Sequence, residues 1–533
     1  MPPYLQILPL KRLVLLLLFG IIGVWFSRWE FDAPYVTTEV FQQVYLTDEG
    51  LYLKPAVALA KTGSVVTPRD ANMATFTTPV HVWLVASAMK IAGMHWTVAR
   101  WVSIFMSGLA LISFWSICRL SVSASVAWLA TLAAASNFMF FHSTRLATAD
   151  PAAMGISLLA VWIWAAHRTS APGLLVALVA AVTAAWAKPT YAPLLVAIGI
   201  TECLAAWSIW RKGSLSAALG RIAVLGVGAA LQISLLLYAY SEVSQTVSYT
   251  HARAEGFTVS FGTGVRQMLD SFVFNMPILP AAIAMLLAAL AGFFWQSRER
   301  RKELLRDPIV QLFAAWILAN TTIVGLFPLQ PARYYLPTIF AWTFLAFRIA
   351  AWNGAGYSKG YAALLLLANL SVQIPYYHLW LSQKPAQTYV GISRDIARRI
   401  TGANPGGAKL LAHGLSDWIQ LFDPRITALD IGYRGLDAVD PLSDRVDFWR
   451  PEYLLVNEDD LWSNSDTLAD LKQKSAHFMK DTELLAEYTL LYRNVFPKSS
   501  TTKPNLKLYR VRYKEKASAP AQGSGEKPPI YAK

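Results

Sequence analysis

The fold is indicated by long uncharged stretches such as Pro151-Ala-Ala-Met-Gly-Ile-Ser-Leu-Leu-Ala-Val-Trp-Ile-Trp-Ala-Ala166, which is followed by His167-Arg168. Similar stretches recur along the 533-residue chain, which is 55% hydrophobic and only 15% charged. A soluble domain of ordinary composition carries about 25% charged residues. Apolar stretches of about 20 residues are typical of membrane-spanning helices. The sequence therefore predicts an α-helical polytopic membrane protein.

Hydropathy predicts about eleven spans. Their approximate centres lie near residues 17, 108, 132, 158, 178, 198, 229, 285, 318, 344 and 366. The first follows Lys11-Arg12 and has no small-residue cleavage site after it, so we expect a retained helix and not a signal peptide. Lys and Arg gather in alternate loops, above all in Ser297–Arg306. By the positive-inside rule these loops face the cytoplasm.

The net charge of +14 raises the question of nucleic-acid binding. We exclude that function because the Lys and Arg residues lie in short loops between apolar spans, where they set membrane topology. The two cysteines, Cys118 and Cys203, both lie in apolar spans and offer no disulfide framework or metal knuckle. Glu202 lies inside the sixth predicted span and has no role that the sequence assigns.

The chain divides into a membrane part and a soluble part. Residues 1–381 form the predicted transmembrane domain, with a first extracytoplasmic loop at 28–96. After residue 381, polar residues increase and short strand-like runs alternate with helical ones, which predicts a small α/β domain over 382–513. By span count this domain is extracytoplasmic. Residues 514–533 are rich in Ala, Pro, Gly and Lys and are predicted to be disordered.

Two finer sets of elements are predicted. In the first loop, Glu49–Thr62 and Pro79–Gly93 look like short helices lying in the membrane interface. In the soluble domain the predicted strands are 409–412, 426–429, 453–456, 484–492 and 506–511, and the predicted helices are 389–400 and 465–478.

Charged residues on the outer face are the main indication of function. Asp48 and Glu49 are adjacent carboxylates in the first loop, and carboxylates beside a bilayer are costly unless they are used. The same face carries further charges at span ends, namely Lys54, Arg100, Arg145, Asp150, Lys188 and Arg333. Outer cations run against the positive-inside bias, and an anionic ligand would account for them.

These charges suit transfer of a sugar from a lipid phosphate. The leaving phosphate is already anionic, so Arg and Lys can hold it and stabilise its growing charge. A carboxylate can take the proton of the attacking hydroxyl. A single displacement at the anomeric carbon inverts its configuration. A lipid-linked donor also explains why the catalyst would be a membrane protein.

The same stretches resemble the GT-C superfamily of polyprenyl-phosphate-sugar-dependent glycosyltransferases, and most of all the group that contains protein O-mannosyltransferases and lipid A aminoarabinose transferases. The resemblance covers about residues 10 to 380 in order and spacing. The matching stretches are Thr47-Asp-Glu-Gly-Leu-Tyr-Leu53, Phe76-Thr-Thr-Pro-Val80, Ala99-Arg-Trp-Val-Ser103, Ser143-Thr-Arg-Leu-Ala-Thr-Ala-Asp150, Lys188-Pro189 and Pro331-Ala-Arg-Tyr-Tyr-Leu-Pro337.

The resemblance implies roles for several residues. Asp48 would be the catalytic base, and Glu49 would assist it or orient the acceptor. Asp150 matches a second acidic position. Contacts to the donor would come from Arg333, Lys188 and Arg145, with the outer-face cations Lys54 and Arg100 as further substrate-binding candidates. Relatives often carry His or Lys before the first-loop proline, where this chain has Thr78, with His81 displaced. A divalent metal ion therefore stays open, and no other cofactor is indicated.

The expected partners are a polyprenyl-phosphate sugar and a lipid, glycan or protein acceptor, met on the periplasmic side of a bacterial inner membrane. A transporter or flippase of a lipid-linked sugar is the alternative, although it should show internal repeats and polar residues near mid-membrane. A receptor would leave the first-loop carboxylates unexplained. Structural roles are also open: Thr47, Asp48 and Glu49 could begin a helix, Asp150 could cap one, and Arg333 could be an interfacial anchor.

Overall fold

The computed structural model describes residues 42–63, 78–144, 146–244, 290–294, 297–325, 332–352, 358–381, 389–412, 415–430, 450–457, 473, 479–489 and 505–514. Several predictions lie outside these ranges. They are the spans centred near residues 17 and 285, nearly all of the helix 465–478, the tail beyond residue 514, and Arg145.

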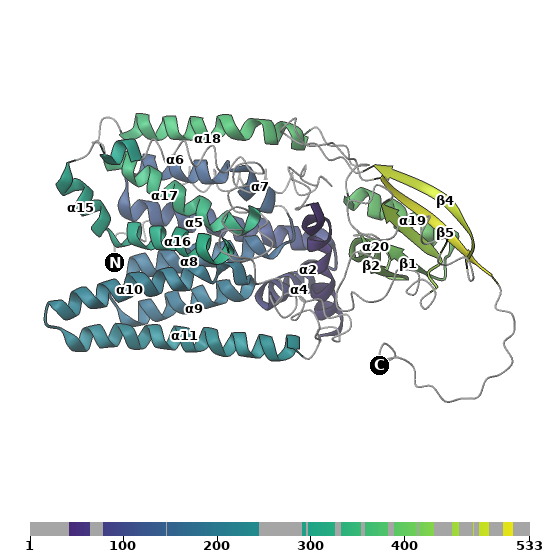
Figure 1. Cartoon of the computed structure of the whole chain (residues 1–533), viewed down its shortest axis with the longest axis horizontal. Coiled ribbons are helices and arrows are strands. Elements are labelled where there is room, and N and C mark those ends of the chain that lie inside the picture. Colours follow the sequence, from purple (N-terminus) through teal and green to yellow (C-terminus); the bar gives the residue numbers. More distant parts are fainter. Residues whose placement is uncertain are drawn as a thin grey trace.

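Most of the described chain is a bundle of helices, with a sheet domain beyond one end (Figure 1). The helices are α2 (Gln42–Thr62), α4 (Pro79–Ala92), α5 (Trp96–Ser121), α6 (Ala124–Ala135), α7 (Phe138–Thr144), α8 (Ala149–His167), α9 (Ala171–Ala187), α10 (Pro193–Arg211), α11 (Leu215–Ser244), α15 (Arg298–Arg306), α16 (Pro308–Gly325), α17 (Leu336–Trp352) and α18 (Ser358–Leu381). Two 3-10 turns, η2 (Pro189–Tyr191) and η3 (Ala332–Tyr335), join them.

Four helices in the described part of the chain are long and apolar enough to cross a membrane: α5, α8, α11, and the helix over 189–211 that contains η2 and α10. Five shorter apolar helices accompany them. The chain is therefore an apolar helical bundle suited to a membrane, as the hydropathy predicts, and the count of about eleven spans is not established by these residues.

Helix α8 is the centre of the bundle, and small residues allow its close packing. It lies against α5 and α9, and 67% of its apolar window is buried, against 11% for the peripheral α11. A Cβ atom on Gly155 would lie 2.5 Å from the carbonyl oxygen of Met106, so only glycine permits this approach. Small residues at helix contacts are typical of membrane bundles. The exposed face of α11 is apolar, as expected of a surface in contact with lipid.

Helices α2 and α4 lie between the bundle and the sheet domain (Figure 1). Helix α4 begins with Pro79 at its first turn and ends within one residue of the prediction. Helix α2 differs from the prediction because it begins at Gln42 and not near Glu49. Asp48 and Glu49 are thus inside a helix, and the interpretation that they begin one is wrong.

The C-terminal part is a five-stranded mixed sheet with helices α19 (Tyr389–Ala403) and α20 (Ser416–Phe422), as the alternation of strand and helix predicts. The strand order is β2-β1-β3-β5-β4, with β1 parallel to β2 and β3, and with β5 antiparallel to β3 and β4. The strands are β1 (Ala408–Ala412), β2 (Ile426–Asp430), β3 (Tyr453–Asn457), β4 (Met479–Thr489) and β5 (Asn505–Tyr513). Strand β4 begins before the predicted 484, because it pairs with the whole length of β5.

One hydrophobic cluster joins the sheet domain to the helices beside it. Buried Leu410 and Leu508 of the sheet belong to the same cluster as Ala56 of α2, Val85 of α4 and Trp418 of α20. Burial of apolar surface stabilises such contacts by roughly 25 cal/mol per Å². The sheet domain is thus packed on the end of the bundle through α20, α2 and α4.

Candidate functional site

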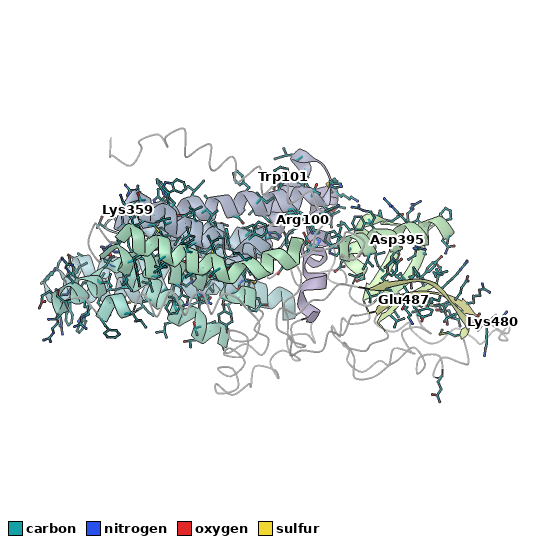
Figure 2. All side chains as sticks on the ribbon, turned by 90° about the horizontal axis from the view of Figure 1, so that it is seen from above. Arg100, Trp101, Lys359, Asp395, Lys480 and Glu487 are labelled. Carbon is teal, nitrogen blue, oxygen red and sulfur yellow. The ribbon has the colours of Figure 1, made fainter. Side chains whose placement is uncertain are left out.

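A buried ion pair fixes the first-loop helix to the bundle. The Arg100 guanidinium donates from Nε to Glu49 Oε1 and from Nη2 to Oε2, each at 2.7 Å, and the two side chains are 0% and 1% exposed. The backbone N–H of Ala147 also donates to Glu49 Oε1, at 2.8 Å. Bidentate geometry and an added donor are what a buried pair needs to offset desolvation. Glu49 is therefore held in one orientation by α5 and by the segment before α8. Figure 2 shows Arg100 at the end of the bundle nearest the sheet domain, with Lys359 at the other end.

A second buried ion pair lies at the start of α8. Lys188 Nζ donates to both carboxylate oxygens of Asp150, at 2.7 and 2.6 Å. Asp150 lies in the first turn of α8, where the helix dipole favours an anion, and Thr148 is the N-cap. The prediction that Asp150 is itself the cap is wrong by two positions. Lys188 ends α9 and lies 5.1 Å from the ring centroid of Tyr334, which brings η3 into the same neighbourhood.

His81 lies near the second ion pair and near the Ala147 backbone, which binds Glu49. Its ring makes an edge-to-face contact with Tyr52 of α2 at 5.4 Å, and it is 1% exposed. Helix α4 has only 14 residues and is not one of the spanning helices. Burial lowers the pKa of His81 to about 4, while the Ala147 backbone and the charge of Asp150 oppose the shift. The imidazole is therefore neutral at pH 7. His81 was not among the predicted site residues, because the type of a single histidine does not show that charged residues will lie near it.

The structure brings the two ion pairs, Glu49–Arg100 and Asp150–Lys188, to the start of α8, because the Ala147 amide that binds Glu49 is three residues before Asp150. Lys54 is on a different side of α2, with its Nζ atom 3.9 Å from Asp417 in α20. Asp48 precedes Glu49 within α2, and Arg333 lies in η3 next to Tyr334, but their side chains, like the whole of Arg145, are outside the described part of the structure.

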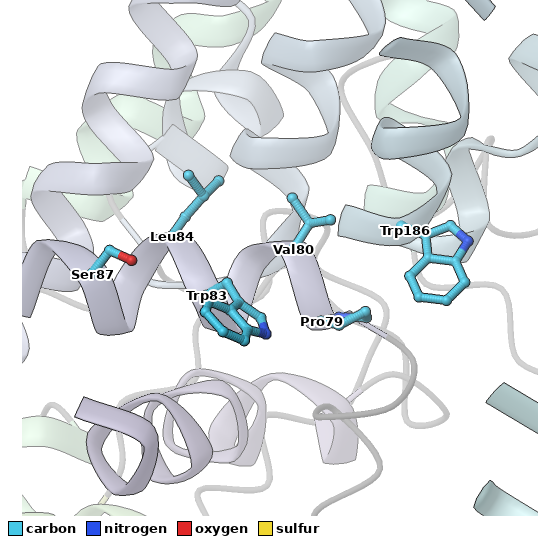
Figure 3. A pocket seen from close by; sticks show the side chains of 6 residues that line it. All are labelled: Pro79, Val80, Trp83, Leu84, Ser87 and Trp186. Carbon is cyan, nitrogen blue, oxygen red and sulfur yellow. The ribbon is translucent and has the colours of Figure 1, made fainter. Parts of the chain in front are cut away.

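An open apolar groove lies between α4 and the end of α9 (Figure 3). Its volume is 410 Å³. It is lined by Pro79, Val80, Trp83, Leu84 and Ser87 of α4 and by Trp186 of α9. Trp186 is two residues before Lys188, so one wall of the groove belongs to the same end of α9 as the second ion pair.

Glu202 is paired at the other end of α8. Its carboxylate accepts from Trp164 Nε1 at 2.8 Å and forms an ion pair with Arg221 of α11. Arg221 also donates to the backbone carbonyl of Arg168 at 3.1 Å. The cluster ties α8, α10 and α11 together, which accounts for a carboxylate inside a span. Among the described residues, no group of three or more His, Cys, Asp or Glu could hold a metal ion.

No family model matches the chain, and no curated protein matches its sequence. Solved structures do match. ArnT from Cupriavidus metallidurans bound to undecaprenyl phosphate is 12% identical, with a TM-score of 0.56 over 94% of this chain and 98% of that one. Its apo state is 14% identical, again with a TM-score of 0.56, over 94% and 97% of the two chains. The chain therefore has the fold of ArnT.

A second solved protein also aligns, with a lower TM-score. The Archaeoglobus fulgidus oligosaccharyltransferase tethered to an acceptor peptide is 13% identical, with a TM-score of 0.47 over 92% of this chain and 75% of that one. The likeness to ArnT spans both the helical bundle and the sheet domain, because nearly the full length of both chains is aligned. The expected fold, a helical membrane bundle with a small C-terminal sheet domain, agrees with this likeness.

Proposed function

We propose that this protein is an inverting membrane glycosyltransferase that moves a sugar from a polyprenyl phosphate to an acceptor hydroxyl. The observation that carries the proposal is the pair of buried carboxylate–cation contacts, Glu49–Arg100 and Asp150–Lys188, at one end of an apolar bundle beside an open apolar groove. Charged groups are expensive in such a bundle and are typical of functional sites. ArnT, which has the same fold, is solved with undecaprenyl phosphate bound.

The donor would lie with its isoprenoid chain in the groove and its phosphate near Lys188. A groove lined by Val80, Trp83 and Trp186 offers apolar contact to the chain. Lys188 is held by Asp150. Its ammonium group has three N–H donors, so one of them can donate to a phosphate oxygen while others remain bound to Asp150. Arg333 is the second proposed phosphate contact, because its neighbour Tyr334 lies over Lys188.

Asp48 is the proposed base. Glu49 is engaged by Arg100 and by the Ala147 amide, so its role is to fix α2 and, with it, the preceding carboxylate. In the reaction the acceptor oxygen forms a bond to the anomeric carbon and its proton passes to Asp48. The bond from that carbon to the phosphate oxygen breaks, and the phosphate leaves with the electron pair. The cations stabilise the charge on the leaving oxygen.

The active end is proposed to face the periplasm. The basic helix α15 lies at the end of the bundle opposite the sheet domain (Figure 1), and positive segments favour the cytoplasmic side. The sheet domain, with the site beneath it, would then be extracytoplasmic. The acceptor stays within three classes, a glycolipid such as lipid A, a polysaccharide or a protein hydroxyl.

The test is transfer by the purified protein from a panel of polyprenyl-phosphate sugars to these acceptors. Asp48→Asn should lower kcat by at least about a hundredfold, the usual contribution of a general base. Asp481→Asn, which changes an exposed carboxylate on β4, is the matched control. Full transfer by Asp48→Asn would remove Asp48 as the base. Movement of the donor between leaflets with no sugar transferred would favour the flippase alternative.

A further inference from the structure

The sheet domain contacts α2 within two residues of the proposed base. We infer that helix α20, through Asp417 and Trp418, is a positioning element that fixes the first-loop carboxylates for catalysis. This inference rests on the proposed function. It gives the C-terminal domain a part in the reaction that neither its sequence nor its fold assigns.

The first contact is a close approach at Gly50. A Cβ atom on Gly50 would lie 2.8 Å from Cβ of Asp417 and 3.3 Å from Cδ1 of Trp418. Carbon atoms in van der Waals contact lie about 3.5–4.0 Å apart, so no larger residue fits without displacing α20. The contact is made by Cβ of Asp417, whose position does not change when the side chain adopts another rotamer. Gly50 follows Glu49 directly, so α20 contacts α2 next to the two carboxylates, Asp48 and Glu49.

The second contact runs through aromatic rings to the Glu49 ion pair. Trp418 makes an edge-to-face contact with Trp96 at 5.7 Å between ring centroids. The guanidinium of Arg100 lies 4.7 Å from the Trp96 ring centroid, a cation–π distance. Arg100 in turn holds both oxygens of Glu49. α20 therefore supports Glu49 from two directions, through Gly50 on α2 and through Trp96 and Arg100 on α5.

These contacts bear on the base more directly than on the donor. Helix α4 shares a hydrophobic cluster with Trp418, but the residues of α4 that line the groove are not members of that cluster. The groove and Lys188 belong to α4 and to the end of α9, whereas α20 contacts α2 and Trp96. Loss of the α20 contact should therefore misplace Asp48 while leaving donor binding in place. A displacement of about 1 Å at a catalytic group can lower the rate a hundredfold. The expected signature is a fall in kcat with little change in the donor KM.

The experiment compares steady-state transfer by the full-length wild-type protein, Gly50→Ala, and Gly108→Ala as the control. Gly108 is also a helical glycine, on the helix that carries Arg100, but a Cβ atom there would meet nothing within 4 Å. Gly50→Ala should lower kcat by about tenfold or more and change the donor KM less than about twofold. Gly108→Ala should match the wild type.

A second variant separates positioning from loss of folding. Asp417→Gly removes the Cβ atom that Gly50→Ala would meet, so the double variant Gly50→Ala/Asp417→Gly should recover kcat. A general loss of stability would instead be worsened by a second glycine in a helix. Trp418→Ala should also lower kcat, and Trp418→Phe, which keeps an aromatic ring toward Trp96, should restore part of it.

Each outcome bears on one idea. Absence of transfer by the wild type overturns the proposed function. Wild-type kcat in both Gly50→Ala and Trp418→Ala overturns the positioning role. If Gly50→Ala fails to fold, the positioning role is tested with Trp418→Ala and Trp418→Phe alone. Equal values of kcat in these two proteins would then overturn the role. A rise in donor KM with unchanged kcat would place α20 at the donor site, which also contradicts the inference.

Discussion

Removal of one partner from the Glu49–Arg100 pair should destabilise the protein far more than removal of both. Arg100 and Glu49 are 0% and 1% exposed, and three hydrogen bonds of 2.7 to 2.8 Å converge on the carboxylate. Arg100→Met leaves a buried carboxylate with the Ala147 amide as its remaining donor among these three. Breaking such a pair costs about 3–5 kcal/mol.

The double variant gives the magnitude of the coupling. In Glu49→Gln/Arg100→Met neither side chain is charged, and the Gln oxygen can still accept from Ala147. Its cost should be about 1–3 kcal/mol, that of an imperfectly satisfied polar group. Two single changes that cost about 3–5 kcal/mol each would sum to roughly 6–10 kcal/mol. The double-mutant cycle should therefore give a coupling free energy of several kcal/mol, with the double variant more stable than either single one.

The measurement is the free energy of unfolding in detergent, followed by tryptophan fluorescence. Arg512→Met is the matched control, because it breaks an ion pair with Glu483 in which the side chains are 58% and 45% exposed. An exposed pair of this kind contributes about 0–1 kcal/mol. A loss of less than about 1 kcal/mol in Arg100→Met, equal to the control, would refute the reasoning that the Glu49 pair is buried and essential to the site.

Three further predictions concern other contacts. Lys188→Met should raise the donor KM by about tenfold or more, because a charge-assisted hydrogen bond to the phosphate is lost, and Lys188→Arg should recover part of the affinity; initial rates against donor concentration measure both. Arg221→Met should lower the free energy of unfolding by about 3–5 kcal/mol, since Glu202 is left buried, while donor KM stays constant; unfolding curves and kinetics on the same preparation check this. Burial raises the pKa of Asp417, against the opposing charge of Lys54, so the folded state binds its proton more tightly than the unfolded state does. The contribution of Asp417 to the stability of the α2–α20 contact should therefore be largest below about pH 4 and be lost as the pH rises through the raised pKa. The difference between wild type and Asp417→Asn in proteolysis of the sheet domain against pH should show this, because the opposite contributions of Asp395 and Asp423 are the same in both proteins.

Each of these has a contrary result. An unchanged donor KM in Lys188→Met would place the phosphate elsewhere. Normal stability of Arg221→Met would mean that the Glu202 cluster is not the tie between α10 and α11. Protection of the sheet domain in the wild type, relative to Asp417→Asn, that increases as the pH rises above about 4 would reverse the sign argued for Asp417.

The sequence predicted the elements better than their contacts. Uncharged runs such as that of α8 identify helices because apolar length is a local property. The cost of a carboxylate beside a bilayer was enough to single out Glu49. Its pairing with Arg100, 51 residues away, was not predictable, because the partner depends on how α2 and α5 pack. Helix α2 packs against α4 and α20, and these neighbours too are not recorded in any local pattern.

The contact at Gly50 also could not be predicted from the sequence. A glycine within Thr47–Leu53 is not unusual, and only the structure shows that a side chain at position 50 would collide with Asp417. For His81 the residue type alone is misleading in the opposite direction. A histidine is a common metal or phosphate ligand, whereas burial keeps this imidazole neutral. Sites built between distant helices require the tertiary structure, and a residue's chemical type gives only candidates.

The seating of α20 on α2 has a consequence for biogenesis. Gly50 is among the early residues to leave the ribosome, and Trp418 follows 368 positions later (418 − 50), after the bundle has been inserted. At a synthesis rate of about 5–20 residues per second, this interval is on the order of 20 to 70 s. During that time a nascent chain has its membrane helices but not the contact of α20 with Gly50. If α20 positions the base as proposed, the protein would gain activity only after its last domain has folded.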